Sequence, residues 1–118
     1  MEEKLVDSIK LDNHELLEIF DISRSIAADI WMIGIIFKIK IKISKDIADY
    51  NSIKDKLGDE VIYEVKHERN FIKSSERDTV LSDVKTSFLN TNLKYLSHKD
   101  FADKYIMRKF NEGKRLIY

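Results

Sequence analysis

The sequence predicts an α+β domain: an antiparallel sheet of about four strands, with two C-terminal helices packed on one of its faces. In residues 1–72, most segments alternate apolar and polar side chains as strands do, whereas residues 75–110 carry apolar stripes at helical spacing. The 118 residues contain no internal repeat and no Pro-rich or Gly/Ser-rich linker. We therefore predict one domain over residues 1–118.

The N-terminal segment has the pattern of a β-hairpin. Its apolar residues alternate weakly on both sides of residues 12–15 (DNHE), where Asp12 and Asn13 favour a turn. For residues 23–29 (SRSIAAD) we predict a loop or a single helical turn.

One long strand is predicted over residues 30–43. Its first half is apolar on both faces, as in a central strand. Its second half reads FKIKIKI and alternates strictly, so the isoleucines point to the core while Lys38, Lys40 and Lys42 point to water.

A short helix and a second strand follow. Residues 46–57 place apolar side chains at helical spacing before Gly58, a helix stop signal. Residues 61–72 again read as a strand. If this strand pairs antiparallel with the long one, the three lysines share a face with Glu64 and Glu68, where opposite charges contribute about 0.2–1 kcal/mol per pair.

Two helices are predicted in the last third of the chain. Ser75 and Asp78 have the spacing of a capping box at the start of the first helix, and Ser97 and Asp100 have it at the start of the second. An apolar stripe follows each pair and suits a helix that covers a sheet.

The composition excludes several classes of protein. The chain has no cysteine, which removes disulfides and thiolate chemistry and fits a reducing, cytoplasmic setting. The longest apolar run, residues 30–37, is too short to span a bilayer, so we expect a soluble protein that does not insert in a membrane. No phosphate-binding loop, nucleophile elbow or HExxH motif is present, and we predict no catalytic residue, cofactor or metal site.

Few side chains stand out as candidates for ligand binding, and each has a structural alternative. The lysine stripe is either a solvated face or an anion-binding surface, and we favour the solvated face. Arg24 and the single tryptophan, Trp31, are candidates for a pocket floor; the alternative is an Arg24–Asp29 salt bridge that braces the loop while Trp31 anchors the core.

Two more pairs complete the candidate ligand-binding set. His67 and Arg69 share one face of a strand and are suited to hold an anion, although we favour a polar strand end, where the apolar side of the strand stops and polar groups reach solvent. Arg108 and Lys109 lie near the end of the last helix, where basic groups complement the helix dipole or contact a phosphate.

Three stretches, SRSIAADIW, DEVIYEVKHERNFI and NLKYLSHKDF, form a pattern that resembles small uncharacterised bacterial proteins without an assigned function. The resemblance covers most of the chain and implies one continuous domain. Heavy use of isoleucine, lysine and asparagine with no proline is also typical of AT-rich bacterial or phage genomes.

These observations predict a non-enzymatic interaction or accessory protein that forms a homodimer, because a small sheet with a long strand extends readily across a two-fold axis. The alternative is a binding module for an anionic ligand, either a nucleotide-like small molecule or nucleic acid.

Overall fold

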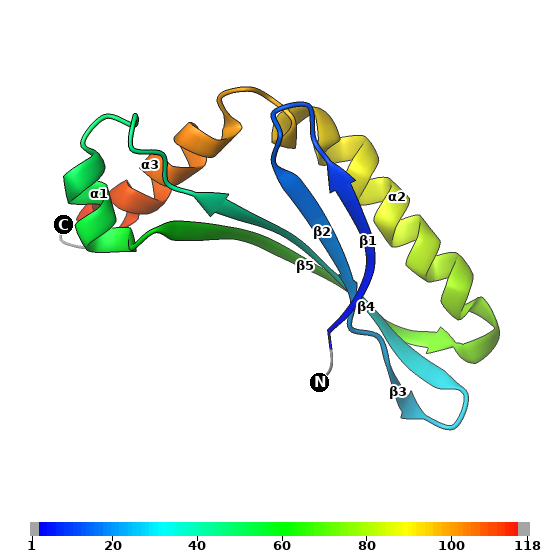
Figure 1. Cartoon of the computed structure of the whole chain (residues 1–118). Helices are drawn as coiled ribbons and strands as arrows, with labels where there is room; N and C mark the ends of the chain where they lie inside the picture. The colour runs from blue at the N-terminus through cyan, green and yellow to red at the C-terminus, as the bar shows by residue number, and fades with distance from the viewer. Residues whose placement is uncertain (1–2, 116–118) are drawn as a thin grey trace.

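The computed structural model describes the backbone of residues 3–115 and the side chains up to Glu112. Within these described residues, five strands and three helices follow one another, with a 3₁₀ turn at Ser74–Glu76 before the second helix (Figure 1). Their bounds are β1 Lys4–Lys10, β2 Leu16–Asp21, β3 Arg24–Ala27, β4 Ile30–Lys42, α1 Tyr50–Leu57, β5 Glu60–Lys73, α2 Arg77–Leu96 and α3 Phe101–Arg115.

The predicted α+β architecture is confirmed. All five strands form one antiparallel sheet in which β4 is central: β2 and β3 pair in succession along one of its edges, and β5 pairs along the other. β1 pairs with β2, which confirms the predicted N-terminal hairpin. β4 and β5 run the length of the molecule, with β3 at one end and α1 at the other (Figure 1).

The helices pack on the sheet face that carries Ile39 and Ile41 of β4. Ile39 and Ile41 are fully buried, as the strict alternation predicts. Phe88 of α2 stacks on Phe37 of β4, with ring centroids 3.7 Å apart and an interplanar angle of 12°. Tyr105 of α3 meets Tyr63 of β5 edge to face at 5.5 Å. The core is thus a layer of strand aliphatics and aromatics covered by helix aromatics.

The prediction of a loop or helical turn over residues 23–29 is wrong, because Arg24–Ala27 form strand β3. The Ser23 hydroxyl explains why the chain can continue along β4. It accepts a hydrogen bond from the Gly34 N–H at 3.0 Å, while the Ser23 N–H donates to a carboxylate oxygen of Asp21 at 2.8 Å. Side-chain groups thus replace the missing ladder bonds between β2 and β3, so both strands follow the same edge.

The predicted helix starts also need correction. Asp49 has a left-handed φ of 60°, so α1 begins at Tyr50 rather than at residue 46, and it ends at Gly58 as predicted. Ser75 lies within the 3₁₀ turn, and α2 begins at Arg77 with no side-chain cap. The backbone N–H of Arg77 donates to the carbonyl of Ser74, so main-chain bonds replace the predicted capping box.

Ser97 ends α2 instead of capping α3. Its N–H donates to the carbonyl of Leu93 at 2.9 Å. At the start of α3, the ring nitrogen Nδ1 of His98 accepts the N–H of Asp100 at 3.1 Å. A histidine therefore supplies the side-chain acceptor that the sequence assigned to a serine.

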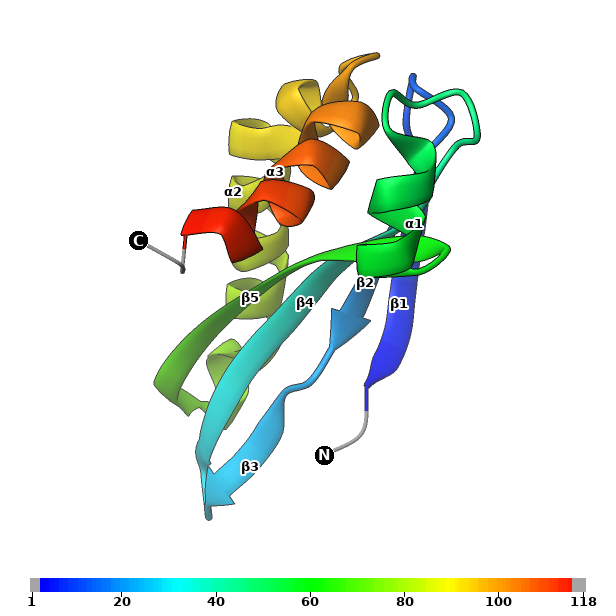
Figure 2. The ribbon, with the colours of Figure 1, turned by 90° about the vertical axis from the view of Figure 1, so that its left-hand side faces the viewer.

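The molecule is elongated. Its Cα radius of gyration is 17.2 Å, and its principal extents are 53 × 34 × 23 Å. A compact domain of this length has a radius of about 13 Å. The long, two-stranded extension of β4 and β5 accounts for this shape and leaves a large part of β5 at the periphery (Figure 2).

Candidate functional site

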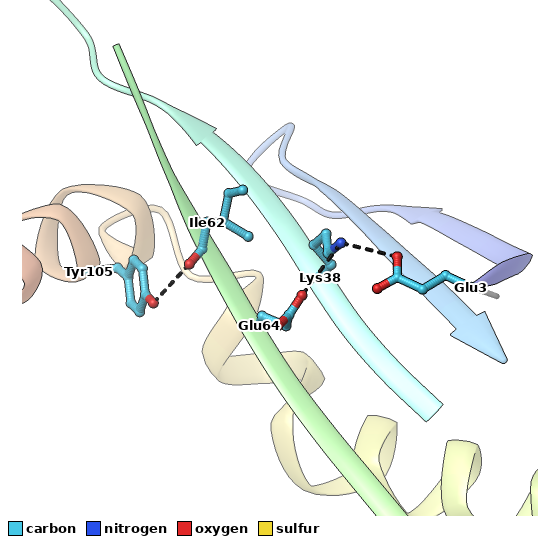
Figure 3. Close-up of polar contacts among 5 residues, drawn as sticks. All are labelled: Glu3, Lys38, Ile62, Glu64 and Tyr105. Carbon is cyan, nitrogen blue, oxygen red and sulfur yellow. Dashed lines mark hydrogen bonds and ion pairs between the residues drawn. The ribbon is translucent and has the colours of Figure 1, made fainter. Parts of the chain in front are cut away.

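The three lysines of β4 lie on the sheet face opposite the helices, but they are not equivalent. Lys38 is only 15% exposed and lies 3.4 Å from Glu64 and 3.5 Å from Glu3 (Figure 3). Its ammonium group also lies 5.0 Å from the ring centre of Phe20. Lys40 and Lys42 are exposed beside it. One lysine is therefore a structural bridge, and the other two form a solvated face.

The same open face carries apolar side chains. By the strand register, Leu5 pairs with Phe20 on this side, and Ile62 pairs with Lys40. Leu5, Leu16 and Ile62 are each close to half exposed. The open face is thus a mixture of aliphatic and charged groups.

The outer edge of β5 is the second exposed feature. Figure 2 shows β5 at one margin of the sheet and β1 at the other. The N–H of Ile43 donates to the carbonyl of Asp59, which fixes the phase of the antiparallel ladder. Hydrogen-bonded pairs therefore involve odd-numbered residues of β5. The N–H and C=O groups of the even-numbered residues, among them Glu64 and Lys66, point away from β4.

Both ends of this outer edge are closed by side chains. The hydroxyl of Tyr105 donates to the carbonyl of Ile62 at 3.1 Å (Figure 3). At the other end, the guanidinium of Arg69 donates at 3.3 Å to the carbonyl of Glu68, which is four residues beyond Glu64. Between these contacts lie the backbone groups of Glu64 and Lys66. No other strand of the described chain pairs with β5 on this side.

The predicted Arg24–Trp31 site is only partly assembled. Arg24 is exposed on β3, and within residues 3–115 it forms no ion pair with Asp29. The guanidinium of Arg77, from the first turn of α2, lies 4.4 Å from the ring centre of Trp31. Trp31 and Arg77 line a small hollow of about 230 Å³ together with Asp21, Ser23, Asp78 and Leu81.

His67 and Arg69 share the helix-covered face, in register with Ile35 and Ile33. The His67 ring makes edge contacts with Phe88, at 5.7 Å between ring centroids, and with Phe37. Its immediate surroundings are aromatic, which supports a packing role.

Arg108 and Lys109 lie at the far end of the molecule, on α3. Both cations approach the Tyr105 ring, at 5.2 and 5.6 Å from its centre, and Lys109 lies 3.6 Å from Glu112. Since β3 and α3 are at opposite ends of the long axis (Figure 1), the structure does not bring Arg24 and Arg108 together.

The shifted pKa values lie at structural positions. The hydrogen bond and charge of Lys85, 2.7 Å away, lower the pKa of Asp7 and tie β1 to α2. Burial raises the pKa of Glu15, at the tip of the β1–β2 hairpin, and that of Tyr63 under the helices.

The described residues contain neither a cluster of metal-binding side chains nor a helix that could span a membrane. Residues 3–115 hold no cluster of three or more histidine or carboxylate side chains placed to bind a metal ion. None of the helices in this part of the chain combines the length and the hydropathy needed to cross a bilayer.

Sequence reasoning missed Tyr105 and Glu64 as edge residues. By helical spacing Tyr105 belongs to the apolar stripe of the last helix, and the predicted antiparallel pairing places Glu64 with the lysines of the long strand. The signal was available in part: charged side chains along a strand are one device by which natural proteins protect a sheet edge. Which edge of β5 has no partner strand among the described residues, however, follows only from the sheet topology.

Comparisons with family models, with curated proteins and with solved structures give no match to this chain.

Proposed function

We propose that this protein is a non-enzymatic interaction protein that pairs with a second copy of itself through the outer edge of β5. The observation that carries the proposal is the outward-facing backbone of Glu64 and Lys66, which no strand of the described residues pairs with and which the contacts of Tyr105 and Arg69 bracket. An unpaired strand edge is a template for another strand. The two closed ends leave a defined stretch for that second strand.

The charges on this stretch select one register. In an antiparallel pair centred on Val65, Glu64 lies opposite Lys66 of the second copy, and Lys66 lies opposite Glu64. Both residues direct their N–H and C=O groups outward, so this register forms four backbone hydrogen bonds and two favourable charge pairs. A pair centred on Lys66 opposes lysine to lysine and Glu64 to Glu68. A pair centred on His67 uses the carbonyl of Glu68, which already accepts from Arg69.

The helix-covered face supports the same register. Val65, which is half-buried, lies beside Val65 of the second copy at the two-fold axis. Tyr63 then lies opposite His67, so aliphatic and aromatic side chains meet across the axis. Such cross-strand pairs are favourable in sheets.

Pairing at β5 joins two open faces into one continuous surface. That surface presents the half-exposed Leu5, Leu16 and Ile62 of both copies. We propose that a protein partner binds there, in the cytoplasm, because a chain without cysteine has none of the disulfides that are typical of proteins in oxidising compartments. The edge contact alone is small for a protein interface, so we expect a reversible dimer.

Lys66→Pro tests the proposal with little damage to the fold. The N–H of Lys66 points outward, so proline removes a donor to the second copy and spares the ladder to β4. Lys66→Thr is the matched control, because it keeps the N–H and a good strand former. In sedimentation equilibrium at micromolar concentration, wild type and Lys66→Thr should show twice the 13.9 kDa of one chain. Lys66→Pro should show one chain, with an unchanged circular dichroism spectrum.

Two results would contradict the proposal. A wild-type protein that remains at the mass of one chain up to high micromolar concentration would show that the dimer does not form. A Lys66→Pro protein that dimerises as well as wild type would show that the outer edge of β5 is not the dimer interface.

A further inference from the structure

A second surface, which includes neither Glu64 nor Lys66 of β5, has the chemistry of a small-molecule site. It is a hollow of about 410 Å³ at the junction of α2 and α3, within the 300–1,000 Å³ range of ligand pockets. The residues that line this junction hollow are Thr91, Lys94, Tyr95, His98, Phe101 and Lys104.

The floor of the junction hollow is aromatic. Phe101 is 2% exposed, and Tyr95 above it remains 50% exposed. Their rings meet edge to face, with centroids 5.3 Å apart and an interplanar angle of 82°. A half-exposed tyrosine against a buried phenylalanine leaves a ring face available for a flat apolar group.

The rim of the junction hollow is cationic. Lys94 and Lys104 line it, and within the described part of the chain neither forms an ion pair. Lys94 lies in the last turn of α2, where the helix dipole stabilises a cation. Lys104 lies near the start of α3, where the dipole opposes one. Helix electrostatics therefore do not explain Lys104, and none of the described residues that line the hollow is a carboxylate.

His98 also lines the hollow and adds a donor. Its Nδ1 accepts the N–H of Asp100, so in the neutral ring the proton resides on Nε2. The side-chain amide of Asn13 donates to the carbonyls of Leu96 and His98, at 2.8 and 2.9 Å. These bonds fix the α2–α3 connection to the β1–β2 hairpin, so the rim is held in place before any ligand arrives.

We infer that the junction hollow binds a small organic anion with an aromatic ring, bearing a carboxylate or a phosphate group. The ring lies on Tyr95 over Phe101, and the anionic group lies between Lys94 and Lys104, within reach of His98. This inference does not depend on self-association, because the hollow and the outer edge of β5 share no residue.

The probes are 2-naphthoate and 2-naphthyl phosphate, with neutral 2-naphthamide as the control ligand. Binding is followed by isothermal titration and by backbone amide shifts in NMR spectra. We expect both anions to bind and to shift the amides of α2 and α3 around Tyr95, and the amide to bind at least about tenfold more weakly. The tighter of the two anions identifies the head group.

Lys94→Gln and Lys104→Gln should each weaken 2-naphthoate binding about fivefold, since each removes one charged contact. Lys99→Gln is the matched control: Lys99 is exposed in the same connection but does not line the hollow, and its substitution should change nothing. Equal binding of naphthoate and naphthamide, unchanged affinity in both lysine variants, or no binding at millimolar probe would each overturn the inference.

Discussion

The hydroxyl of Tyr105 donates a hydrogen bond to the carbonyl oxygen of Ile62 at 3.1 Å, across 43 residues of sequence. The contact fastens α3 to the outer edge of β5 and closes that edge where the helix lies. It therefore separates the covered part of β5 from the part that remains open to a second strand.

Tyr105→Phe removes this hydrogen bond and keeps the ring packing against Tyr63 and Phe101. We expect the free energy of unfolding to fall by about 1 kcal/mol, the usual contribution of one such bond. Urea titration followed by circular dichroism measures the change. A variant as stable as wild type would mean that water replaces the hydroxyl at no cost.

Lys38 and Lys40 should respond differently to the same substitution. Lys38→Gln removes the link between Glu3 and Glu64 and should cost about 0.5–1 kcal/mol, whereas Lys40→Gln should change stability by less than about 0.5 kcal/mol. Thermal unfolding at low and high salt separates them, because only the loss at Lys38 should shrink as salt rises. Equal losses at both positions would contradict the assignment of Lys38 as a bridge.

Gly34 permits the close approach of Ile22 on the open side of the sheet. A Cβ atom at this position would lie 2.8 Å from Cγ1 of Ile22 and 3.1 Å from the sulfur of Met32. Gly34→Ala should therefore destabilise the fold by about 1–3 kcal/mol through overpacking.

The matched test for Gly34 is a double-mutant cycle. Because Ile22→Ala removes the obstructing atoms, the double variant Gly34→Ala/Ile22→Ala should lose less stability than the two single losses combined. Strict additivity in urea titrations would show that the cost at Gly34 has another origin.

Glu15 should make the protein less stable as the pH rises. Burial raises its pKa above that of a solvent-exposed glutamate, so the folded state favours the neutral carboxyl. Stability is then highest below the unfolded pKa and falls as the pH rises through the folded pKa. Glu15→Gln should raise the melting temperature at pH 7 and leave it unchanged at pH 3. A gain of equal size at both values would contradict an ionisation effect.

The periodic parts of the fold were predictable because their cause is local. Successive side chains of a strand point to opposite faces, so the alternation of FKIKIKI predicts which face of β4 is buried. Gly58 follows the last residue of α1 with a φ of 82°, which leaves the helical conformation and which glycine adopts more readily than other residues. Strand β3 was missed because the Ser23 hydroxyl bonds Gly34, eleven residues away, and no local pattern reports such a bond.

The candidate site was less accessible to sequence reasoning. Arg24 and Arg108 have the chemistry of anion binders, but their positions on β3 and α3 keep them apart. The open stretch at Glu64 and Lys66 depends on the ladder phase and on a tyrosine from α3. Both are products of the assembled topology, whereas the alternating Glu64, Lys66 and Glu68 were visible from the start.

The most direct test of the β5 dimer uses the absence of cysteine from the chain. In the register centred on Val65, that residue alone lies opposite itself, as a pair without ladder hydrogen bonds, whose Cβ atoms lie about 4.5–5.5 Å apart. Val65→Cys should therefore oxidise to a disulfide-linked dimer on non-reducing gels, whereas Glu68→Cys, distant from its own copy, should not. A Val65→Cys protein that stays monomeric, or a Glu68→Cys protein that cross-links equally well, would contradict pairing at this edge.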